Sequence, residues 1–469
     1  MTEPAVSIVD AMTDPMLFGP TFGGESFAAW RALLGGFYGL PMDEDEAETF
    51  KALTGRSEAP TRPHGELWLA IGRRGGKTQA GAVLALYEAC LRDHRDKLSS
   101  GEVATVMVIA ADRRQARTAM RYISGLVNDN PMLRRMVKRE TTEEIEFNNR
   151  CTIEVHTASF RAVRGYTLAA VIADEVAFWH VDGANPDAEI IAALRPALAT
   201  LGAPLIALSS PYAKRGVLWN QYRRHYGEGE SSVLVAQAAS RTMNPTLPER
   251  VVDDAMKDDA ARASAEYLAH FRSDIATLLA PELIENAMRP KPLEIPPANG
   301  LEYIAFTDPA GGGSDEFTMA IGHKEEAAVV VDLVRGLRGS PAQIVEEFAA
   351  VLKKYGIRRV TGDRYAGRWP RDEFQKHSIE YQVSELDRSG LYLELLAAMN
   401  SGRVELPCCK KTARQLGALE RRTSRSGRDL IDHPPGGNDD RANAVAGLVA
   451  DALANRGPAM VRVKRLRGF

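Results

Sequence analysis

A glycine-rich loop with a lysine and a threonine is the first part of the chain that could do chemistry. The loop consists of Gly72, Arg73, Arg74, Gly75, Gly76, Lys77 and Thr78. Its glycines let the backbone approach phosphate and expose N–H groups to it ahead of a helix. Lys77 would neutralise the β- and γ-phosphates of a nucleotide, and the Thr78 hydroxyl would ligate Mg²⁺. Ile71 stands where a glycine is usual, so the loop alone is only moderately specific.

Two adjacent carboxylates supply what hydrolysis needs beyond phosphate binding. Asp174 and Glu175 directly follow an apolar run with the composition of a buried strand. Asp174 can hold the Mg²⁺ shell, and Glu175 can orient and deprotonate the attacking water. The next predicted strand ends in Ser209 and Ser210, whose hydroxyls could sense the γ-phosphate. Together with the loop, these residues predict a site that binds ATP and Mg²⁺.

A second set of carboxylates lies in the C-terminal part of the chain. Asp308 and Asp363 each end a predicted strand, and Asp439 and Asp440 open a predicted helix. Acids at the ends of separate elements can converge on two Mg²⁺ or Mn²⁺ ions, which stabilise the attacking and leaving oxygens of a phosphodiester. Each acid by itself is more often a turn or cap residue. The ordered set predicts a metal-dependent nuclease site.

The elements that must position these groups follow an α/β pattern. Apolar runs of strand length precede the phosphate loop and the Asp–Glu pair, and helical runs separate them. Such alternation indicates a mainly parallel sheet covered on both faces. The predicted division is an N-terminal helical segment (1–60), a P-loop ATPase core (61–245), a helical connector (246–298) and a nuclease domain with a basic tail (299–469).

Length and composition fit an enzyme of several domains. A chain of 469 residues allows about three domains of roughly 150 residues. No apolar stretch approaches the roughly 18 residues of a membrane span, and the acidic N-terminal residues lack the features of a signal peptide. We therefore expect a cytosolic protein. Cys90, Cys151, Cys408 and Cys409 show no metal-ligand spacing and are expected to be reduced thiols.

Basic residues gather near the C-terminus, although the net charge is −3. They are Arg421, Arg422, Arg425 and Arg428, followed by the basic run 462–467. Such patches attract phosphate, but a charge run is also often a solvated face. We expect the four arginines to lie near DNA.

The order of these motifs resembles the large terminase subunit of tailed bacteriophages, and the resemblance covers nearly the whole chain. It implies a P-loop NTPase of the additional-strand type joined to a ribonuclease H-like nuclease domain. Such a protein hydrolyses ATP to move double-stranded DNA into a procapsid and cuts concatemeric DNA. Its implied partners are DNA, the portal protein, the small terminase subunit and further copies of itself in a ring, expected to be a pentamer. The implied location is the cytoplasm of the bacterial host, with no membrane contact and no place in the mature virion.

Residue roles also follow from the resemblance. In this family an arginine often stands a few positions before the lysine of an irregular phosphate loop, and Arg73 has that place here. The resemblance therefore implies that Arg73 stabilises the charge of the transition state. Arg161 and Arg164 are alternatives for this role, acting in the same or a neighbouring subunit. Ser209 and Ser210 match the motif that couples hydrolysis to domain movement. The implied roles elsewhere are Asp174 for metal, Glu175 as catalytic carboxylate, and Asp308, Asp363 and Asp440 as nuclease ligands, with Asp439 as the rival for the third place.

Some points stay open on the sequence. Family members often carry another acid where this chain has Asn443, so the third or fourth nuclease ligand is not decided. His433 lies nearby in sequence and is more often structural than functional. Two other functions fit the motifs: a DNA helicase or repair ATPase fused to a nuclease, and an ATP-gated assembly factor that docks to a portal-like ring without cleaving DNA.

Overall fold

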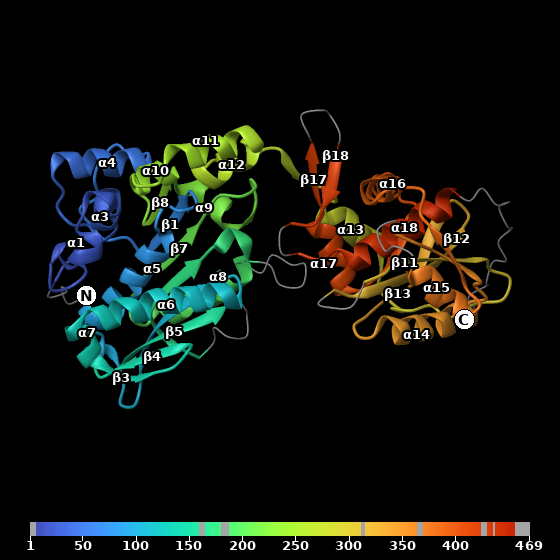
Figure 1. Ribbon diagram of the computed structural model, residues 1–469, viewed down its shortest axis with the longest axis horizontal. Coiled ribbons are helices and arrows are strands. Elements are labelled where there is room, and N and C mark those ends of the chain that lie inside the picture. The colour runs from blue at the N-terminus through green and yellow to red at the C-terminus, as the bar shows by residue number, and fades with distance from the viewer. Residues whose placement is uncertain are drawn as a thin grey trace, which may run out of the picture. The chain divides into compact units, whose positions relative to one another are not determined.

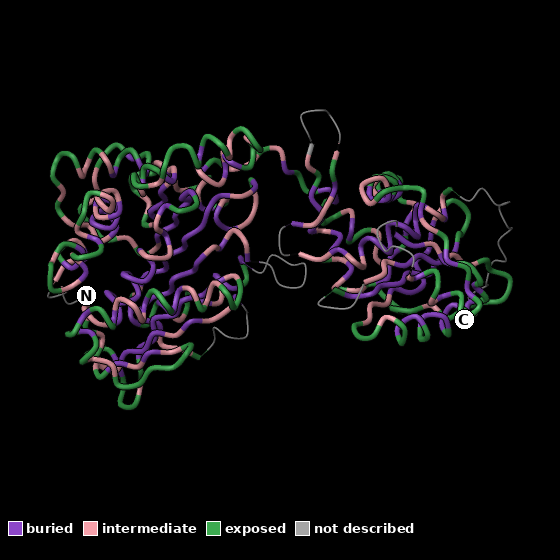
Figure 2. Tube along the Cα trace, in the orientation of Figure 1, coloured by how far each residue is buried: buried purple, intermediate pink, exposed green. Residues whose placement is uncertain are grey.

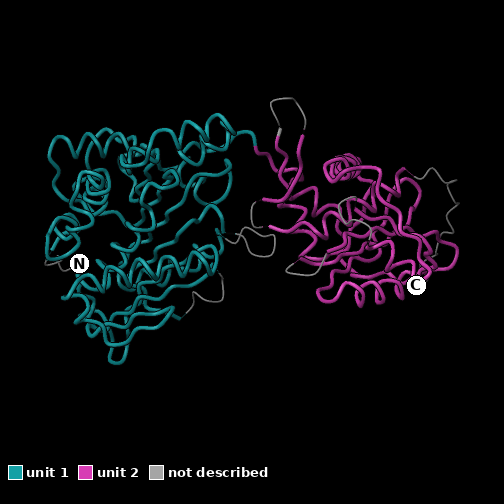
Figure 3. Tube along the Cα trace, in the orientation of Figure 1, with its two compact units in different colours: residues 1–181, 185–274 teal, residues 182–184, 275–469 magenta. Residues whose placement is uncertain are grey.

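The chain forms two compact units that divide between Asp274 and Ile275 (Figure 3). The computed structural model describes residues 6–158, 165–179, 187–310, 315–363, 369–423, 429–434 and 437–454. The segment 246–298, predicted as a connector, is shared between the units. Within the described residues, no helix has both the length and the apolar character that crossing a bilayer requires.

The first unit is built on an eight-stranded sheet with the strand order β3-β4-β5-β2-β6-β7-β1-β8 (Figure 1). Its strands are β1 (Glu66–Ile71), β2 (Ala104–Ala110), β3 (Val137–Glu140), β4 (Glu144–Phe147), β5 (Cys151–Thr157), β6 (Thr167–Asp174), β7 (Leu205–Ser209) and β8 (Val233–Ala238). Strands β5, β2, β6, β7, β1 and β8 pair in parallel, and β3 and β4 extend the edge in antiparallel pairing. Strand β7 lies between β1 and β6. This inserted strand defines the additional-strand type of P-loop fold and confirms the predicted fold class.

Helices cover both faces of this sheet. They are α1 (Ile8–Thr13), α2 (Gly19–Phe22), α3 (Ala28–Phe37), α4 (Glu44–Thr54), α5 (Lys77–Leu86), α6 (Arg113–Asp129), α7 (Pro131–Met136), α8 (Asp187–Ala199), α9 (Gly216–His225), α10 (Ser240–Met243), α11 (Glu249–Asp258) and α12 (Ala260–Leu268). Alternate residues of a strand enter different cores: Leu67 and Leu69 join one apolar cluster, whereas Trp68 joins another. Figure 2 shows the strands as buried along their length. Burial on both faces explains the continuous apolar runs in the sequence.

The second unit has a seven-stranded sheet with the strand order β10-β16-β13-β12-β11-β14-β15. Its strands are β10 (Met288–Arg289), β11 (Tyr303–Asp308), β12 (Phe317–Glu325), β13 (Ala328–Leu337), β14 (Arg359–Gly362), β15 (Glu380–Val383) and β16 (Val404–Pro407). Strands β11, β12 and β13 form an antiparallel meander, and β14 and β15 continue the sheet in parallel from β11. The order β13-β12-β11-β14-β15, with β11 between the antiparallel β12 and the parallel β14, is that of a ribonuclease H-like fold, as predicted.

Helices and a small sheet complete the second unit. The helices are α13 (Pro281–Ala287), α14 (Pro341–Lys354), α15 (Trp369–Lys376), α16 (Arg388–Asn400), α17 (Lys410–Ala418) and α18 (Asp440–Ala454). Alternate residues of a strand again face different apolar cores: Phe306 packs with α16 and α18, and Ala305 packs with α14 and α15. A three-stranded sheet contains β9 (Ile275–Thr277), β17 (Glu420–Thr423) and β18 (Asp429–Asp432). These elements bring β11, β14, α16 and α18 together around the predicted carboxylates.

Candidate nucleotide and metal sites

The glycine-rich loop joins β1 to α5, as its sequence context predicts. Gly76 has a φ of 87°, a left-handed conformation that glycine adopts without steric cost. Hydrogen bonds fix three successive loop carbonyls: Ser240 Oγ donates to Arg73 O at 2.6 Å, Asn244 Nδ2 to Arg74 O at 2.9 Å, and Trp30 Nε1 to Gly75 O at 2.9 Å. The path of the loop is therefore set by side chains from α3, α10 and the segment after α10.

Lys77 is buried at the first position of α5 and faces the other catalytic candidates. Its Nζ donates to Ile71 O at 3.0 Å, Gly72 O at 3.2 Å and Ser210 Oγ at 2.9 Å. The same Nζ is 3.8 Å from Glu175 Oε1. The structure therefore joins the phosphate loop, the Asp–Glu pair and the serine pair in one site.

Asp174 has the environment of a cation ligand. It is the last residue of β6, and it lines one small pocket together with Thr78. Its Oδ1 is buried and has no hydrogen-bond partner among the described residues. Burial, followed by the neighbouring Glu175, raises the pKa of Asp174 to about 7, and Lys77 opposes the shift. A buried carboxylate oxygen without a donor fits a divalent cation held by Asp174 and Thr78.

Glu175 is held in a backbone conformation that is rare for its residue type. Its φ is 51°, in the left-handed region, where a non-glycine residue pays a steric cost. Ser209 Oγ donates to Glu175 Oε2 at 3.1 Å, and the Ser210 N–H donates to the same oxygen at 3.2 Å. Because β7 lies beside β6, its C-terminal serines reach this carboxylate. The contacts fix the orientation of a candidate general base.

Arg73 makes its contacts away from Lys77, Asp174 and Glu175. Its guanidinium forms an ion pair with Glu266 of α12 at 3.1 Å, and its side chain is 56% exposed. Among the described contacts, none joins Arg73 to Lys77, Asp174 or Glu175. Arg161 and Arg164, the alternative arginines, lie outside the described residues.

In the second unit, the structure brings together Asp308, Asp363 and Asp439, whereas the sequence had placed Asp440 before Asp439 as the third carboxylate. Strands β11 and β14 are parallel neighbours, so Asp308 and Asp363 leave the sheet at the same edge. Asn443 of α18 donates from Nδ2 to Asp363 Oδ2 at 2.8 Å. Burial raises the pKa of Asp308 to about 8; the Asn443 hydrogen bond and Arg388 oppose this shift, whereas Asp363 and Asp439 add to it. Asp308, Asp363 and Asp439 therefore interact in one site.

The adjacent Asp439 and Asp440 have different surroundings. Asp439 is 3% exposed, and its Oδ2 accepts a hydrogen bond from the Tyr392 hydroxyl at 2.6 Å. Asp440 Oδ2 instead accepts from the Glu316 N–H at 3.3 Å, beside β12. Burial raises the pKa of Asp440 to about 6. The structure thus brings Asp439, and not Asp440, toward Asp308.

The donor set of this site fits a hard divalent cation. Asn443 Oδ1 is buried and has no hydrogen-bond donor within the described part of the chain. Carboxylate and amide oxygens are the ligands that Mg²⁺ and Mn²⁺ prefer. Ligand atoms of Asp432, His433 and Asp439 also lie within 4.8 Å of one another. Asn443, where the resemblance led us to look for an acid, contacts the site through its amide nitrogen, which donates to Asp363.

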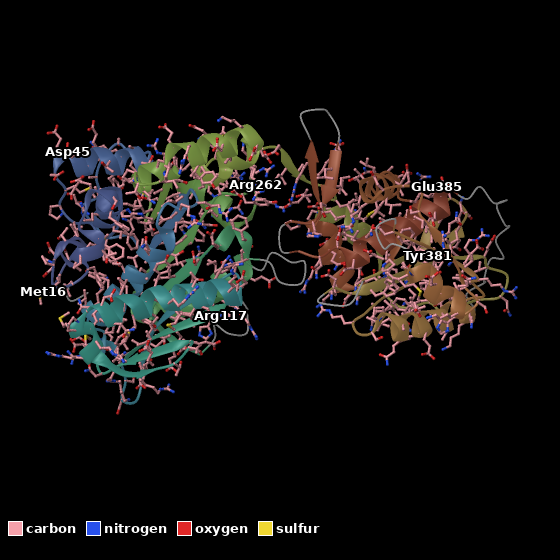
Figure 4. All side chains as sticks on the ribbon, in the orientation of Figure 1. Met16, Asp45, Arg117, Arg262, Tyr381 and Glu385 are labelled. Atoms are coloured by element: carbon pink, nitrogen blue, oxygen red, sulfur yellow. The ribbon has the colours of Figure 1, made fainter. Side chains whose placement is uncertain are left out.

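Several residues around the acids belong to no recognisable sequence motif. Arg388 and Tyr392 lie one helical turn apart on α16, and both contact Asp439. Tyr381 of β15, labelled in Figure 4, is buried, and Asp363 and Asp308 help to raise its pKa. Only the i,i+4 spacing of Arg388 and Tyr392 could have indicated a shared face.

Gly362, directly before Asp363, allows a close approach that a larger residue would block. A Cβ there would lie 2.1 Å from the Tyr381 hydroxyl oxygen and 2.5 Å from Cζ. We expect Gly362→Ala to destabilise the protein by about 1–3 kcal/mol through overpacking. It should also slow the DNA cleavage that the sequence predicts for this site about 100-fold, because small displacements of catalytic groups are costly. Thermal unfolding and cleavage rates measure both effects. Gly417→Ala, whose Cβ would make an ordinary 3.6 Å contact with Ile284, lies in α17 and should leave cleavage unchanged without lowering the unfolding temperature.

The arginines expected near DNA are only partly described. Arg421 pairs with Asp429 at 2.5 Å, and Arg422 pairs with Glu420 at 3.0 Å, both within the small sheet. Arg425, Arg428 and the basic run 462–467 lie outside the described residues. Proximity of these arginines to DNA stays a prediction.

Comparisons with solved structures find phage large terminases. The large terminase of bacteriophage HK97 is 15% identical, and the match covers 90% of this chain and 99% of that chain with a TM-score of 0.39. A large terminase from a thermophilic bacteriophage in complex with ADP is 14% identical, covering 83% and 94% with a TM-score of 0.38. The large terminase nuclease of thermophilic phage G20c is 16% identical, covering 37% and 97% with a TM-score of 0.33.

The chain is thus similar in structure to phage large terminases, at low identity. No model of a protein family matches the sequence, and a search of curated proteins finds no match. Because these TM-scores are low, the fold assignment rests on the chain's own strand order and not on these similarities.

Proposed function

We propose that this chain is the ATPase and nuclease subunit of a viral genome-packaging motor. In this function it hydrolyses ATP to move double-stranded DNA into a procapsid and cuts concatemeric DNA by a two-metal mechanism. The observation that carries the proposal is the presence of two separate acidic centres in two separate units. One gathers Lys77, Asp174 and Glu175 beside a phosphate loop, and the other gathers Asp308, Asp363 and Asp439.

In the first unit, each residue has a role that its contacts support. Lys77 and the loop N–H groups bind the β- and γ-phosphates, while Thr78 and Asp174 hold Mg²⁺. Bound Mg²⁺ supplies charge neutralisation on the phosphates. Glu175 accepts the proton of the attacking water. Ser209 and Ser210, which touch Glu175 and Lys77, relay the state of the nucleotide to β7.

In the second unit, the acids would hold the divalent cations, which would supply charge stabilisation and an activated water for phosphodiester cleavage. Asp308 interacts with both Asp363 and Asp439, so these three acids are the residues that would hold Mg²⁺ or Mn²⁺. We assign the third ligand to Asp439. Asp440, the first choice on the sequence, bonds to the Glu316 backbone and positions the start of α18.

The partners in this proposal come from the sequence resemblance. They are double-stranded DNA, the portal protein, the small terminase subunit, and further copies of the chain in a ring, expected to be a pentamer. Arg73 then has a role at the nucleotide if its ion pair with Glu266 opens in the assembled ring. Contact with backbone charge gives DNA movement that is independent of sequence. The site of action is the host cytoplasm.

A translocation assay on blunt-ended duplex DNA separates this function from its rivals. The packaging motor is expected to displace a bound third strand from a blunt duplex in an ATP-dependent reaction, with portal-bearing procapsids present. It should not unwind a forked duplex, as a helicase would. Lys77→Ala, which removes the buried ammonium, is the negative control. Unwinding without translocation would show a helicase, and ATP turnover with no DNA cleavage would favour an assembly factor.

A further inference from the structure

Arg388 occupies an unusual position within the acidic site of the second unit. It is the first residue of α16, and its guanidinium faces three carboxylates from three different elements. Its NH1 is 3.5 Å from Asp439 Oδ1 and 3.8 Å from Asp432 Oδ1, and its NH2 is 3.7 Å from Asp363 Oδ2. Two of these acids are the proposed metal ligands. A fixed positive charge of the protein therefore lies beside two of the proposed metal ligands.

The three carboxylates attract the Arg388 guanidinium electrostatically but form no hydrogen bonds with it. All three distances exceed the 2.7–3.2 Å of an N–H···O bond, and within the described part of the chain Arg388 makes no such bond. Its side chain is 31% exposed, so an acceptor from solvent can reach it. The N–H groups of Arg388 are therefore available to a further oxyanion.

A purely structural ion pair in this unit has a different geometry. Arg335 donates to the two carboxylate oxygens of Glu294 from Nε at 2.9 Å and from NH2 at 2.8 Å. This two-bond fork is the usual stable arrangement of arginine with a carboxylate. Arg388 forms no fork, although three acids surround it. Its position suits a shared phosphate ligand better than a salt bridge.

The surroundings of α16 fix this position. Asp387 caps the helix by accepting from the Gly390 N–H at 2.8 Å, and Ser389 Oγ accepts from the Ile431 N–H at 3.0 Å. One turn later, the Tyr392 hydroxyl bonds to Asp439. The start of α16 is thus tied to β18 and to the acidic site on either side of Arg388. These contacts hold the Arg388 guanidinium in place beside the acids, and none of them uses its N–H groups.

We propose that Arg388 binds the non-bridging oxygens of the scissile DNA phosphate and stabilises the charge that develops on them during cleavage. The proposal rests on the proposed nuclease function. A planar guanidinium matches two phosphate oxygens. In a site of low dielectric, a donor already in place stabilises the transition state without reorganisation. The acids keep Arg388 oriented until the phosphate enters.

The test compares DNA cleavage with binding of Mn²⁺ alone in the full-length protein. We expect Arg388→Gln to slow plasmid cleavage about 100-fold or more, the loss typical of one transition-state donor. Its affinity for Mn²⁺, measured by calorimetry without DNA, should be unchanged or tighter, because a like charge near the cations is removed. Arg388→Lys should recover part of the cleavage rate. Arg335→Gln is the matched control and should leave both measurements as in the wild type.

Three results would decide against the role of Arg388 or against the site itself. Cleavage by Arg388→Gln at the wild-type rate under saturating Mn²⁺ would make Arg388 only a counter-ion. Loss of Mn²⁺ binding in Arg388→Gln and in Arg388→Lys, with an unchanged unfolding temperature, would show that it positions the acids and does not bind phosphate. A wild-type protein that neither binds Mn²⁺ nor cleaves DNA would overturn the nuclease function, which is a separate failure.

Discussion

Asp308→Asn is expected to abolish DNA cleavage and, at the same time, to make the metal-free protein more stable at pH 8. Asp308 interacts with both Asp363 and Asp439, so the substitution would remove one of the carboxylates proposed to hold the divalent cations. Because metal-ion charge stabilisation is worth several kcal/mol, we expect the cleavage rate to fall at least about 1,000-fold. ATP hydrolysis, which uses residues of the other unit, should continue.

The stability effect follows from the raised pKa of Asp308. Its ordinary pKa is 3.8, and burial raises the pKa in the folded protein to about 8. Between these values the folded state holds a proton that the unfolded state has lost, so the stability that Asp308 contributes declines as the pH rises from about 4 to 8. Asparagine is neutral throughout and avoids this decline. We expect a gain of at least about 1 kcal/mol at pH 8, or a few degrees in unfolding temperature.

Thermal unfolding in EDTA at pH 5 and pH 8, together with plasmid cleavage in Mn²⁺, measures both effects. The gain in stability should be larger at pH 8 than at pH 5. Asp372→Asn, at an exposed position of α15, should change neither the stability nor the cleavage. Full Mn²⁺-dependent cleavage by Asp308→Asn would show that the nuclease site is misassigned.

The parts of the sites that sequence reasoning found are those whose signal is local. The phosphate loop is contiguous, and its glycines, lysine and threonine have fixed places relative to one strand and one helix. Asp174, Asp308 and Asp363 end strands, and parallel strands bring their carboxyl ends to one edge. The sequence predicted that Asp308 and Asp363 converge, and in the structure the parallel pairing of β11 with β14 brings both to the same edge of the sheet.

The parts that could not be predicted depend on contacts between distant segments. Asp439 and Asp440 are neighbours of the same type, and their directions depend on where α18 begins and on which donors surround it. Tyr392 and Glu316 decide that outcome, yet neither is close to these aspartates in sequence. Arg388 belongs to no motif, and only the packing of α16 beside α18 places it among the acids.

The first unit has a comparable feature that the sequence did not predict, the backbone conformation of Glu175. Its residue type and its place after an apolar run predicted a catalytic carboxylate. Its left-handed φ of 51° could not be predicted, because no glycine or asparagine marks the position. The contacts with Ser209 and Ser210 maintain this conformation, so a strained residue coincides with the predicted centre of hydrolysis.

Glu175→Gln is therefore expected to separate ATP binding from ATP hydrolysis. Glutamine has nearly the same shape and keeps an oxygen that can accept from Ser209 and Ser210, so the loop and Lys77 should still bind nucleotide. It cannot accept a proton from water, and loss of a general base typically costs 100- to 10,000-fold; we expect about 1,000-fold in turnover. Nucleotide affinity by fluorescence titration and phosphate release by steady-state assay measure the two steps separately.

The control for Glu175→Gln is Lys77→Ala, which should lose nucleotide affinity as well as turnover, because Lys77 contacts the loop, Ser210 and Glu175 together. DNA cleavage should be retained by both variants in the absence of ATP, since their changes lie in the first unit. Turnover by Glu175→Gln within tenfold of the wild type would exclude Glu175 as the base. Glu175 would then be left with an orienting role, through its contacts with Ser209 and Ser210.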